Sequence, residues 1–219
     1  MAKPKQFRSE QTRQALILAA AELFDRYGYG ATSVSDILEH AASSKGAMYF
    51  HFAGKEELAY AVVEEQHRLW TAEAEVLAGA QGSGLELMLQ LSRDLAELLR
   101  VNVVVRAGIR LTFENATYRD PVPGIYGDWV GVITGLLERA RDQRELRADV
   151  QPDFLARVFV SSYTGVRVLS QALGTELAPQ LGEMWEALLP CAVHPRKLAH
   201  FRAYARALHC GGVAVARPV

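Results

Sequence analysis

The sequence is poor in cysteine and has no long uninterrupted apolar run. Its two cysteines, Cys191 and Cys210, allow at most one disulfide and do not form a CxxC pair, so we expect reduced thiols. Arginines interrupt the most apolar stretches, so no segment is long and apolar enough to span a membrane. The first residues are basic but lack the apolar segment of a signal peptide, which favours a cytoplasmic protein.

The motifs of common enzyme classes are missing too, namely the P-loop, GxSxG, HExxH and any metal-binding spacing of Cys and His. Glu64 and His67 form one ExxH pair, the spacing of half a di-iron site in a helical bundle. A working site needs a second such pair, and the sequence has none. We therefore expect no catalytic residue, no metal and no cofactor, and an all-helical enzyme is the weaker alternative.

Helical periodicity runs through the whole sequence, and sustained two-residue alternation is absent. With 50% hydrophobic and 22% charged residues, the chain is typical of a globular protein, here of the all-α class. We expect a first helix capped by Ser9 and ended by Gly28 and Gly30, and a long helix over residues 55–78. Further helices are expected over residues 85–101, 103–113, 126–141, 152–173, 176–189 and 198–208.

Three N-terminal helices, the second and third short and tightly joined, indicate a helix-turn-helix. Ser33 followed by Asp36 predicts a capping box at the start of the second helix. Ser43 or Ser44 opens the third helix after a turn of only a few residues.

Charge is unevenly distributed along the chain, although the net charge is only −1. Basic residues outnumber acidic ones over residues 1–55, whereas acidic residues are in excess in the remainder. A mildly basic end on an acidic body suits a small DNA reader attached to a larger regulatory domain. We therefore predict a helix-turn-helix domain over residues 1–54 and a helical ligand-binding and dimerisation domain over residues 55–219.

The third helix carries residue types that suit contact with DNA. It combines a capping hydroxyl, a positive charge, a small-residue surface that leaves base edges accessible, and polar-tipped rings that reach phosphates. The apolar side chains of Met48, Phe50 and Phe52 are expected to face the small three-helix core. The candidates for DNA contact are Ser44, Lys45, Gly46, Ala47, Tyr49 and His51, with Lys55 at the start of the next helix.

The stretch from Thr32 to Leu58 resembles the N-terminal domain of the TetR family of repressors. The family's usual run is Ser or Thr, then Lys-Gly-Ala-Leu-Tyr-x-His-Phe, a short loop, Lys and Glu. Here the run is SKGAMYFHF from Ser44 to Phe52, followed by Lys55-Glu56, and the likeness covers about residues 8–68. The resemblance implies contacts with double-stranded DNA by Thr32, Ser33, Ser44, Lys45, Tyr49, His51 and Lys55.

Two positions depart from the family pattern. Met48 replaces Leu, a change that conserves volume and should matter little. Ala42-Ser43 stands where the family has Gly-Val in the turn between the two short helices. That turn requires a positive φ, which costs Ala on the order of 1 kcal/mol relative to Gly, so we predict a slightly looser turn.

Other stretches resemble the gamma-butyrolactone receptors of Streptomyces-type bacteria, notably VVVRAGIRL from Val103, Asp128-Trp129 and GVRVLS from Gly165. This resemblance implies that a small molecule enters the C-terminal domain and moves the fourth helix. The two heads of a homodimer then no longer match the half-sites of a palindromic operator, which are about one turn of DNA apart. A pseudo-receptor that responds to an antibiotic or another small molecule, and activation instead of repression, remain alternatives.

In that sub-family a tryptophan at the position of Trp129 lines the lactone pocket. We add Gln66 and Ser162 as donors to a lactone carbonyl, although a core role is the alternative for each. Arg106 and Arg110 are one helical turn apart and are expected to be partly buried ion-pair partners. The apolar candidates for contact with an acyl chain, again with a core role as the alternative, are Met88, Ile133, Val166 and Trp185.

Two helices, over residues 152–173 and 176–189, have more apolar surface than one subunit easily covers. Pairing of both helices across two subunits makes a four-helix bundle, which would be the homodimer interface. Burial inside the monomer is the alternative. The expected partners are thus DNA, a small molecule and a second copy of the chain, and no membrane.

Overall fold

A computed structural model describes residues 4–114 and 125–209 of the chain. Cys210 lies outside these residues, whereas Cys191 is exposed and not disulfide-bonded. The described residues form ten helices: α1 (Pro4–Ala31), α2 (Val34–His40), α3 (Lys45–His51), α4 (Lys55–Gly79), α5 (Gly84–Val101), α6 (Val103–Glu114), α7 (Ile125–Asp142), α8 (Pro152–Leu173), α9 (Leu177–Ala192) and α10 (Leu198–His209).

The all-α class predicted from the periodicity is confirmed. Within the described ranges, none of the helices has both the length and the apolar character needed to cross a membrane. The chain divides into two compact units, the first formed by Met1–Thr71 with Leu98–Pro123, the second by Ala72–Glu97 with Gly124–Val219. The predicted boundary between a DNA-binding domain over residues 1–54 and a ligand-binding domain over residues 55–219 falls within the first unit. This boundary stays a prediction.

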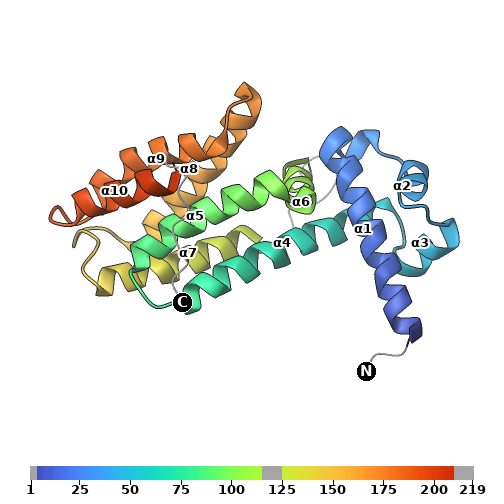
Figure 1. The fold of residues 1–219 in the computed structure, drawn as a ribbon, viewed down its shortest axis with the longest axis horizontal. Coiled ribbons are helices and arrows are strands. Elements are labelled where there is room, and N and C mark those ends of the chain that lie inside the picture. Colours follow the sequence, from blue (N-terminus) through green and yellow to red (C-terminus); the bar gives the residue numbers. More distant parts are fainter. Residues whose placement is uncertain (1–3, 115–124, 210–219) are drawn as a thin grey trace. The chain divides into compact units, whose positions relative to one another are not determined.

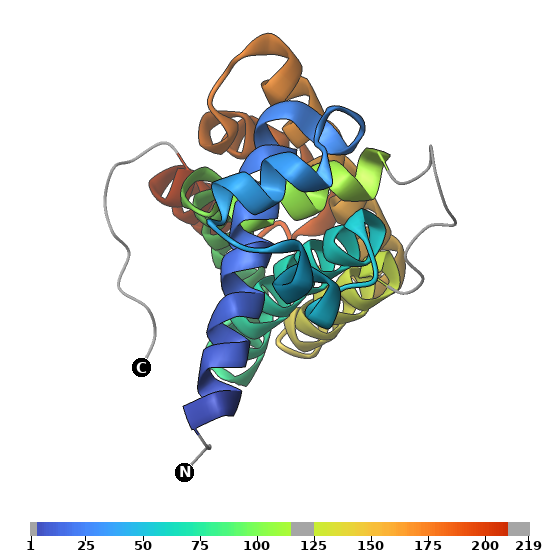
Figure 2. The same cartoon turned by 90° about the vertical axis from the view of Figure 1, so that its right-hand side faces the viewer.

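In the first unit, α1 packs against α2, α3 and α6. Two views of the molecule show α2 and α3 beside α1 (Figures 1 and 2). The apolar side chains that these helices share form a small, fully closed core, as the spacing of apolar residues predicts. Its centre is built by Leu16, Ile17, Phe24, Ile37 and Met48, each at most 2% exposed.

The first helix differs from the prediction at both ends. It begins at Pro4 rather than after Ser9, since Pro is well suited to the first turn of a helix. Gly28 interrupts it with φ 82° and ψ 170°, a conformation that is essentially restricted to glycine. A Cβ there would lie 2.6 Å from Arg110 Nη2 and 2.9 Å from Glu114 Oε1, so glycine also makes room for α6.

The turn chemistry of the helix-turn-helix is confirmed. The Ser33 hydroxyl accepts the Asp36 N–H and the Asp36 carboxylate accepts the Ser33 N–H, which completes the capping box of α2. Ser44 caps α3 in the same way, since its hydroxyl accepts the N–H of Ala47 at 3.1 Å. Ala42 has a φ of 47°, as expected for a turn in which the family has glycine.

In the second unit, α8 packs between α7 and α9, and α9 packs also against α10. The sequence predicted that α9 ends at residue 189, but the helix continues through Pro190 to Ala192. A proline so near the end removes only one helical hydrogen bond, which explains why it is tolerated. The apolar face of α9 is covered within the protomer, where Leu181, Trp185 and Leu189 are at most 3% exposed.

The strained turn at Ala42 leads to a direct stability test. Replacing Ala42 with Gly should raise the free energy of unfolding by about 1 kcal/mol, because glycine adopts a positive φ without the Cβ clash. The neighbouring Ala41, with φ −78°, is the matched control, and Ala41→Gly should lower the same quantity by about 0.5–1 kcal/mol. Urea denaturation followed by circular dichroism measures both, and equal effects of the two changes would refute the strain.

Candidate DNA-reading helix and ligand-contacting residues

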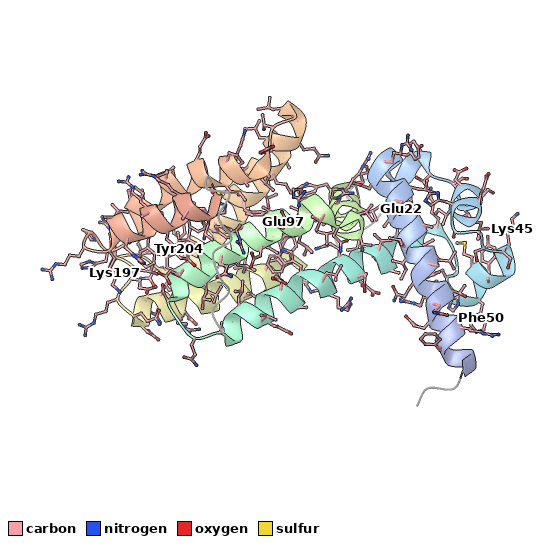
Figure 3. All side chains as sticks on the ribbon, in the orientation of Figure 1. Glu22, Lys45, Phe50, Glu97, Lys197 and Tyr204 are labelled. Atoms are coloured by element: carbon pink, nitrogen blue, oxygen red, sulfur yellow. The ribbon has the colours of Figure 1, made fainter. Side chains whose placement is uncertain are left out.

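The helix α3 lies against the first unit's core through one side only. Met48 is fully buried and Phe52, just after the helix, is 3% exposed, so these two fix the inward face. Lys45, Gly46 and Tyr49 are exposed. Figure 3 marks Lys45 on this helix. The outward face therefore carries a positive charge, a small residue and a phenol, as expected for a DNA-reading helix.

The prediction for Phe50 is wrong. It was expected to face the core, but its side chain is 77% exposed (marked in Figure 3). Successive helical residues are about 100° apart, so a residue two positions after the buried Met48 lies on the opposite side of α3. The Phe50 ring lies edge to face against that of its neighbour His51, with the two centroids 5.0 Å apart.

The polar groups of Thr32 and Lys55 have internal partners. The Thr32 hydroxyl, which is buried, donates to the carbonyl of Gly28 at 2.8 Å. The Lys55 ammonium donates to the carbonyls of Tyr29 and Thr32, both at 2.9 Å, and lies 4.1 Å from the centroid of the Tyr29 ring. These two residues hold the junction between α1, α2 and α4, and their contact with DNA stays a prediction.

The remaining predicted DNA contacts lie at the ends of the two short helices. Ser33 and Ser44 are exposed and use their hydroxyls as helix caps, which leaves further lone pairs and the helix ends accessible. Ala47 and His51 are half-buried, with the His51 ring 6.2 Å from that of Phe52. Their contacts with DNA also stay predictions.

Two arginines of α6 form ion pairs and hydrogen bonds with the interrupted end of α1. Arg106 forms an ion pair with Asp25 at 2.9 Å. Arg110 donates to the Asp25 carbonyl at 2.8 Å and pairs with Glu114 at 2.7 Å. Glu114 in turn accepts the N–H of Tyr29 at 2.8 Å. The expected role of the two arginines as partly buried ion-pair partners is confirmed, and their polar contacts join α6 to the segment that leads into α2.

Gln66 on α4 is an unusual buried residue. Its side chain is fully buried, and neither its amide nitrogen nor its amide oxygen has a hydrogen-bond partner among the described residues. It packs directly on α6, where a Cβ at Gly108 would overlap its Cβ and Cγ atoms. A buried amide without a partner costs about 1–3 kcal/mol per polar group, so it is a strong candidate for contact with a ligand.

In the second unit, Trp129 of α7 belongs to a group of aromatic and charged residues that the sequence did not predict. Its ring lies 5.4 Å from that of Tyr126. Burial lowers the pKa of the Arg167 guanidinium on α8, and the nearby hydroxyls of Tyr126 and Tyr163 oppose this shift. Tyr163 is buried, its hydroxyl has no partner among the described residues, and burial raises its pKa. A polar group buried without a partner marks Tyr163 as a further candidate for ligand contact.

Trp185 has a structural role within the second unit. Its indole N–H donates to the Ser92 hydroxyl at 3.0 Å, and its ring stacks on Phe159 with centroids 5.1 Å apart. Ser92 also lies 3.1 Å from Nε2 of His209. Burial, with a smaller contribution from the charge of Arg93, lowers the pKa of His209 to about 4, so this residue is a neutral core histidine near pH 7.

The other predicted ligand contacts are distributed over three helices of the second unit. Met88 and Ile133 are at most 1% exposed. Ser162 and Val166 on α8 are half-buried. For these residues, as for Trp129, contact with a ligand stays a prediction.

Two family models match successive parts of the chain. Residues 16–62 match the model of the bacterial regulatory proteins of the tetR family, and residues 82–195 match the tetracyclin repressor-like C-terminal domain. The chain belongs to the TetR family. It is therefore a DNA-binding transcriptional regulator of the TetR type, and the prediction that it is not an enzyme is confirmed.

Within the TetR family, the chain is similar to receptors from Streptomyces. It is 37% identical to the A-factor receptor protein of Streptomyces griseus over 200 residues, which cover 90% of this chain and 70% of the relative. A crystal structure of a gamma-butyrolactone receptor, an ArpA-like protein, matches with a TM-score of 0.80 and 37% identity, over 93% of this chain and 98% of the other. The predicted likeness to gamma-butyrolactone receptors is thus confirmed.

A third similar structure is that of CprB from Streptomyces coelicolor, solved in complex with its biological operator sequence. It matches with a TM-score of 0.77 and 38% identity, over 93% of this chain and 98% of the other. The arrangement of helices in this TetR-type chain is thus shared with a protein that binds operator DNA.

The two lysines of the reading segment should differ in what they do. Lys45→Met should weaken binding to all DNA sequences alike and lower the slope of log affinity against log salt by about 1 for each protomer bound, without changing the free energy of unfolding. Lys55→Met should lower the free energy of unfolding by about 1–3 kcal/mol, because two backbone carbonyls lose a charged donor. Fluorescence anisotropy over a salt series and urea denaturation measure these effects. A lower free energy of unfolding for Lys45→Met but not for Lys55→Met would contradict the structure.

Proposed function

We propose that the protein is a ligand-responsive repressor that binds a palindromic operator as a homodimer and is released by a small molecule of the gamma-butyrolactone class. The observation that carries the proposal is the fully buried amide of Gln66, whose oxygen and nitrogen have no partner among the described residues. A lactone carbonyl can accept from the amide nitrogen, and a ligand hydroxyl can donate to the amide oxygen. The site of action of such a protein is chromosomal DNA, which suits a cytoplasmic location.

The position of Gln66 suits a residue that transmits binding to the DNA-reading helix. It lies on α4, which begins at Lys55, four residues after the end of α3 at His51. It also packs on Gly108 of α6, the helix whose arginines hold the end of α1. A ligand that bonds to Gln66 therefore acts on two helices that position the reading head.

The ligand class is supported by the relatives and by the chemistry of the candidate residues. Receptors of A-factor and of gamma-butyrolactones are among the similar proteins. The Gln66 amide is an uncharged donor and acceptor, which suits a neutral lactone. By resemblance to the gamma-butyrolactone receptors, Trp129 is a candidate for contact with the lactone.

A homodimer is supported by the surface of α8. Four large apolar side chains along it are exposed: Phe154 by 60%, Val168 by 45%, Leu169 by 53% and Leu173 by 62%. Gly165 has open space around the position of a Cβ, which allows close approach of a second helix. Pairing of α8 with its copy would remove this apolar surface from water. The corresponding face of α9 is covered inside the protomer, so we restrict the proposed interface to α8.

Replacing Gln66 with Leu tests the ligand proposal. The variant should bind the operator with normal affinity, because the Gln66 side chain is fully buried and is not part of the exposed face of α3. Release by a gamma-butyrolactone should need at least about fivefold more ligand, since a lost buried hydrogen bond costs about 1 kcal/mol or more. Electrophoretic mobility shifts measure the affinity for DNA from upstream of the protein's own gene. The same assay, titrated with lactones of different acyl length, measures the release.

Gln90→Leu is the matched control, since Gln90 is 1% exposed and its amide nitrogen is also without a partner among the described residues. It should leave release by the lactone unchanged. If Gln66→Leu responds to the lactone like the unaltered protein, Gln66 is not the contact. If no lactone releases the unaltered protein while an antibiotic does, the pseudo-receptor alternative replaces the lactone proposal.

Replacing Leu169 with Asp tests the proposed interface. A charge on the paired surface of α8 should convert the dimer to a monomer at micromolar concentration, because a buried unpaired carboxylate is strongly unfavourable. Analytical ultracentrifugation gives the mass. Val76→Asp places the same charge on a residue of α4 that is 60% exposed, and it should remain dimeric. A dimeric Leu169→Asp variant would remove α8 from the interface.

A further inference from the structure

The side chain of Phe50 has the highest exposure among the large apolar residues that the structure describes, at 77%. It sits on the DNA-reading helix α3, on the side opposite the buried Met48. A phenylalanine that leaves about three quarters of its surface in water contributes little to folding, so its place on this helix calls for another explanation.

The surroundings of Phe50 on α3 are small and uncharged. Gly46 lies four residues earlier, on the same side of the helix, and a Cβ there would meet nothing closer than the Ser44 hydroxyl at 3.9 Å. Phe50 itself offers no hydrogen-bond donor or acceptor and no charge, so it cannot bind a phosphate or the polar edge of a base. The outermost side of the helix is therefore an apolar ring beside an open, glycine-lined surface.

In the major groove of DNA, the apolar group that a base pair presents is the 5-methyl of thymine. We infer that Phe50 is a specificity-determining residue that selects thymine at one position of each operator half-site, through contact of its ring with the 5-methyl group. Gly46, one turn away, leaves the space that lets the helix approach the bases closely enough for this contact. The flanking Lys45 and Tyr49 then position the helix on the backbone, and Phe50 supplies sequence selectivity.

The test replaces thymine with uracil, which removes only the methyl group. An operator from the chain's own upstream region is located by footprinting, and each thymine is changed to uracil in turn, symmetrically in both half-sites. With the unaltered protein, one position should show a loss of affinity of about fourfold per half-site, the effect of one buried methyl group. With Phe50→Ala, affinity for the thymine operator should fall by at least the same factor, and the uracil substitution should then have no further effect.

Two variants serve as controls. Tyr49→Ala should weaken binding to the thymine and uracil operators by the same factor, because its expected contact is with the backbone. Phe7→Ala removes another exposed phenylalanine of the first unit, 61% exposed on α1, and should retain the dependence on thymine. Since Phe50 is exposed, Phe50→Ala should also unfold at the same urea concentration as the unaltered protein.

The inference is overturned if no single thymine-to-uracil change weakens binding by the unaltered protein. It is equally overturned if Phe50→Ala keeps the full dependence on the methyl group. Loss of all binding by Phe50→Ala is resolved by Phe50→Leu, which retains an apolar contact and should retain the preference for thymine over uracil. These outcomes are independent of any ligand, so they stand apart from the test of the lactone proposal.

Discussion

The position of the DNA-reading head, formed by α2 and α3, depends on the contacts that hold the end of α1. Gly28 breaks the helix with a backbone conformation that other residues rarely adopt, and the carbonyls and N–H groups exposed there are bonded from two sides. From α6, the side chains of Arg110 and Glu114 bind the backbone of Asp25 and Tyr29. From α4, the Lys55 ammonium binds two carbonyls on either side of the step into α2. The course of α2 and α3 follows from this junction, because only short turns separate them from it.

The same junction explains how a signal in the first unit can reach the DNA. The helices α4 and α6 both bond to the end of α1, and they touch each other where Gln66 packs on Gly108. In the proposed mechanism, a ligand that completes the hydrogen bonds of Gln66 alters the contact between these two helices. A shift of either helix changes its polar contacts with the end of α1, and such contacts have discrete geometries. The contacts of α4 and α6 with the end of α1 can thus switch between two discrete arrangements instead of deforming gradually.

Sequence reasoning predicted the parts of this molecule that depend on neighbouring residues. The caps at Ser33 and Ser44 follow from local chemistry, whereas the positive φ of Ala42 is implied by the family pattern, which has glycine there. The structure has all three. The orientation of Phe50 was predicted wrongly, because an apolar residue was assigned to the core without applying the helical period from Met48. The burial of Tyr163 was not predicted at all. Its spacing of four residues from Phe159 and seven from Ala156 places it on the buried side of α8. Only the packing of α8 against its neighbours leaves its hydroxyl without a partner among the described residues.

The motif that identified the family combines two kinds of residue which the sequence alone does not separate. Lys55 matches the family pattern as well as Lys45 does, yet its ammonium is engaged with backbone carbonyls of its own domain, whereas Lys45 is exposed. Thr32 is likewise bonded internally, and Phe50, at a position that the pattern leaves open, is the most outward apolar side chain described. A match to the TetR pattern therefore indicates chiefly that α2 and α3 fold and are held in the TetR arrangement. The choice of DNA sequence is then expected at the variable, outward positions, where a substitution changes the contacted base without disturbing the junction that holds the head.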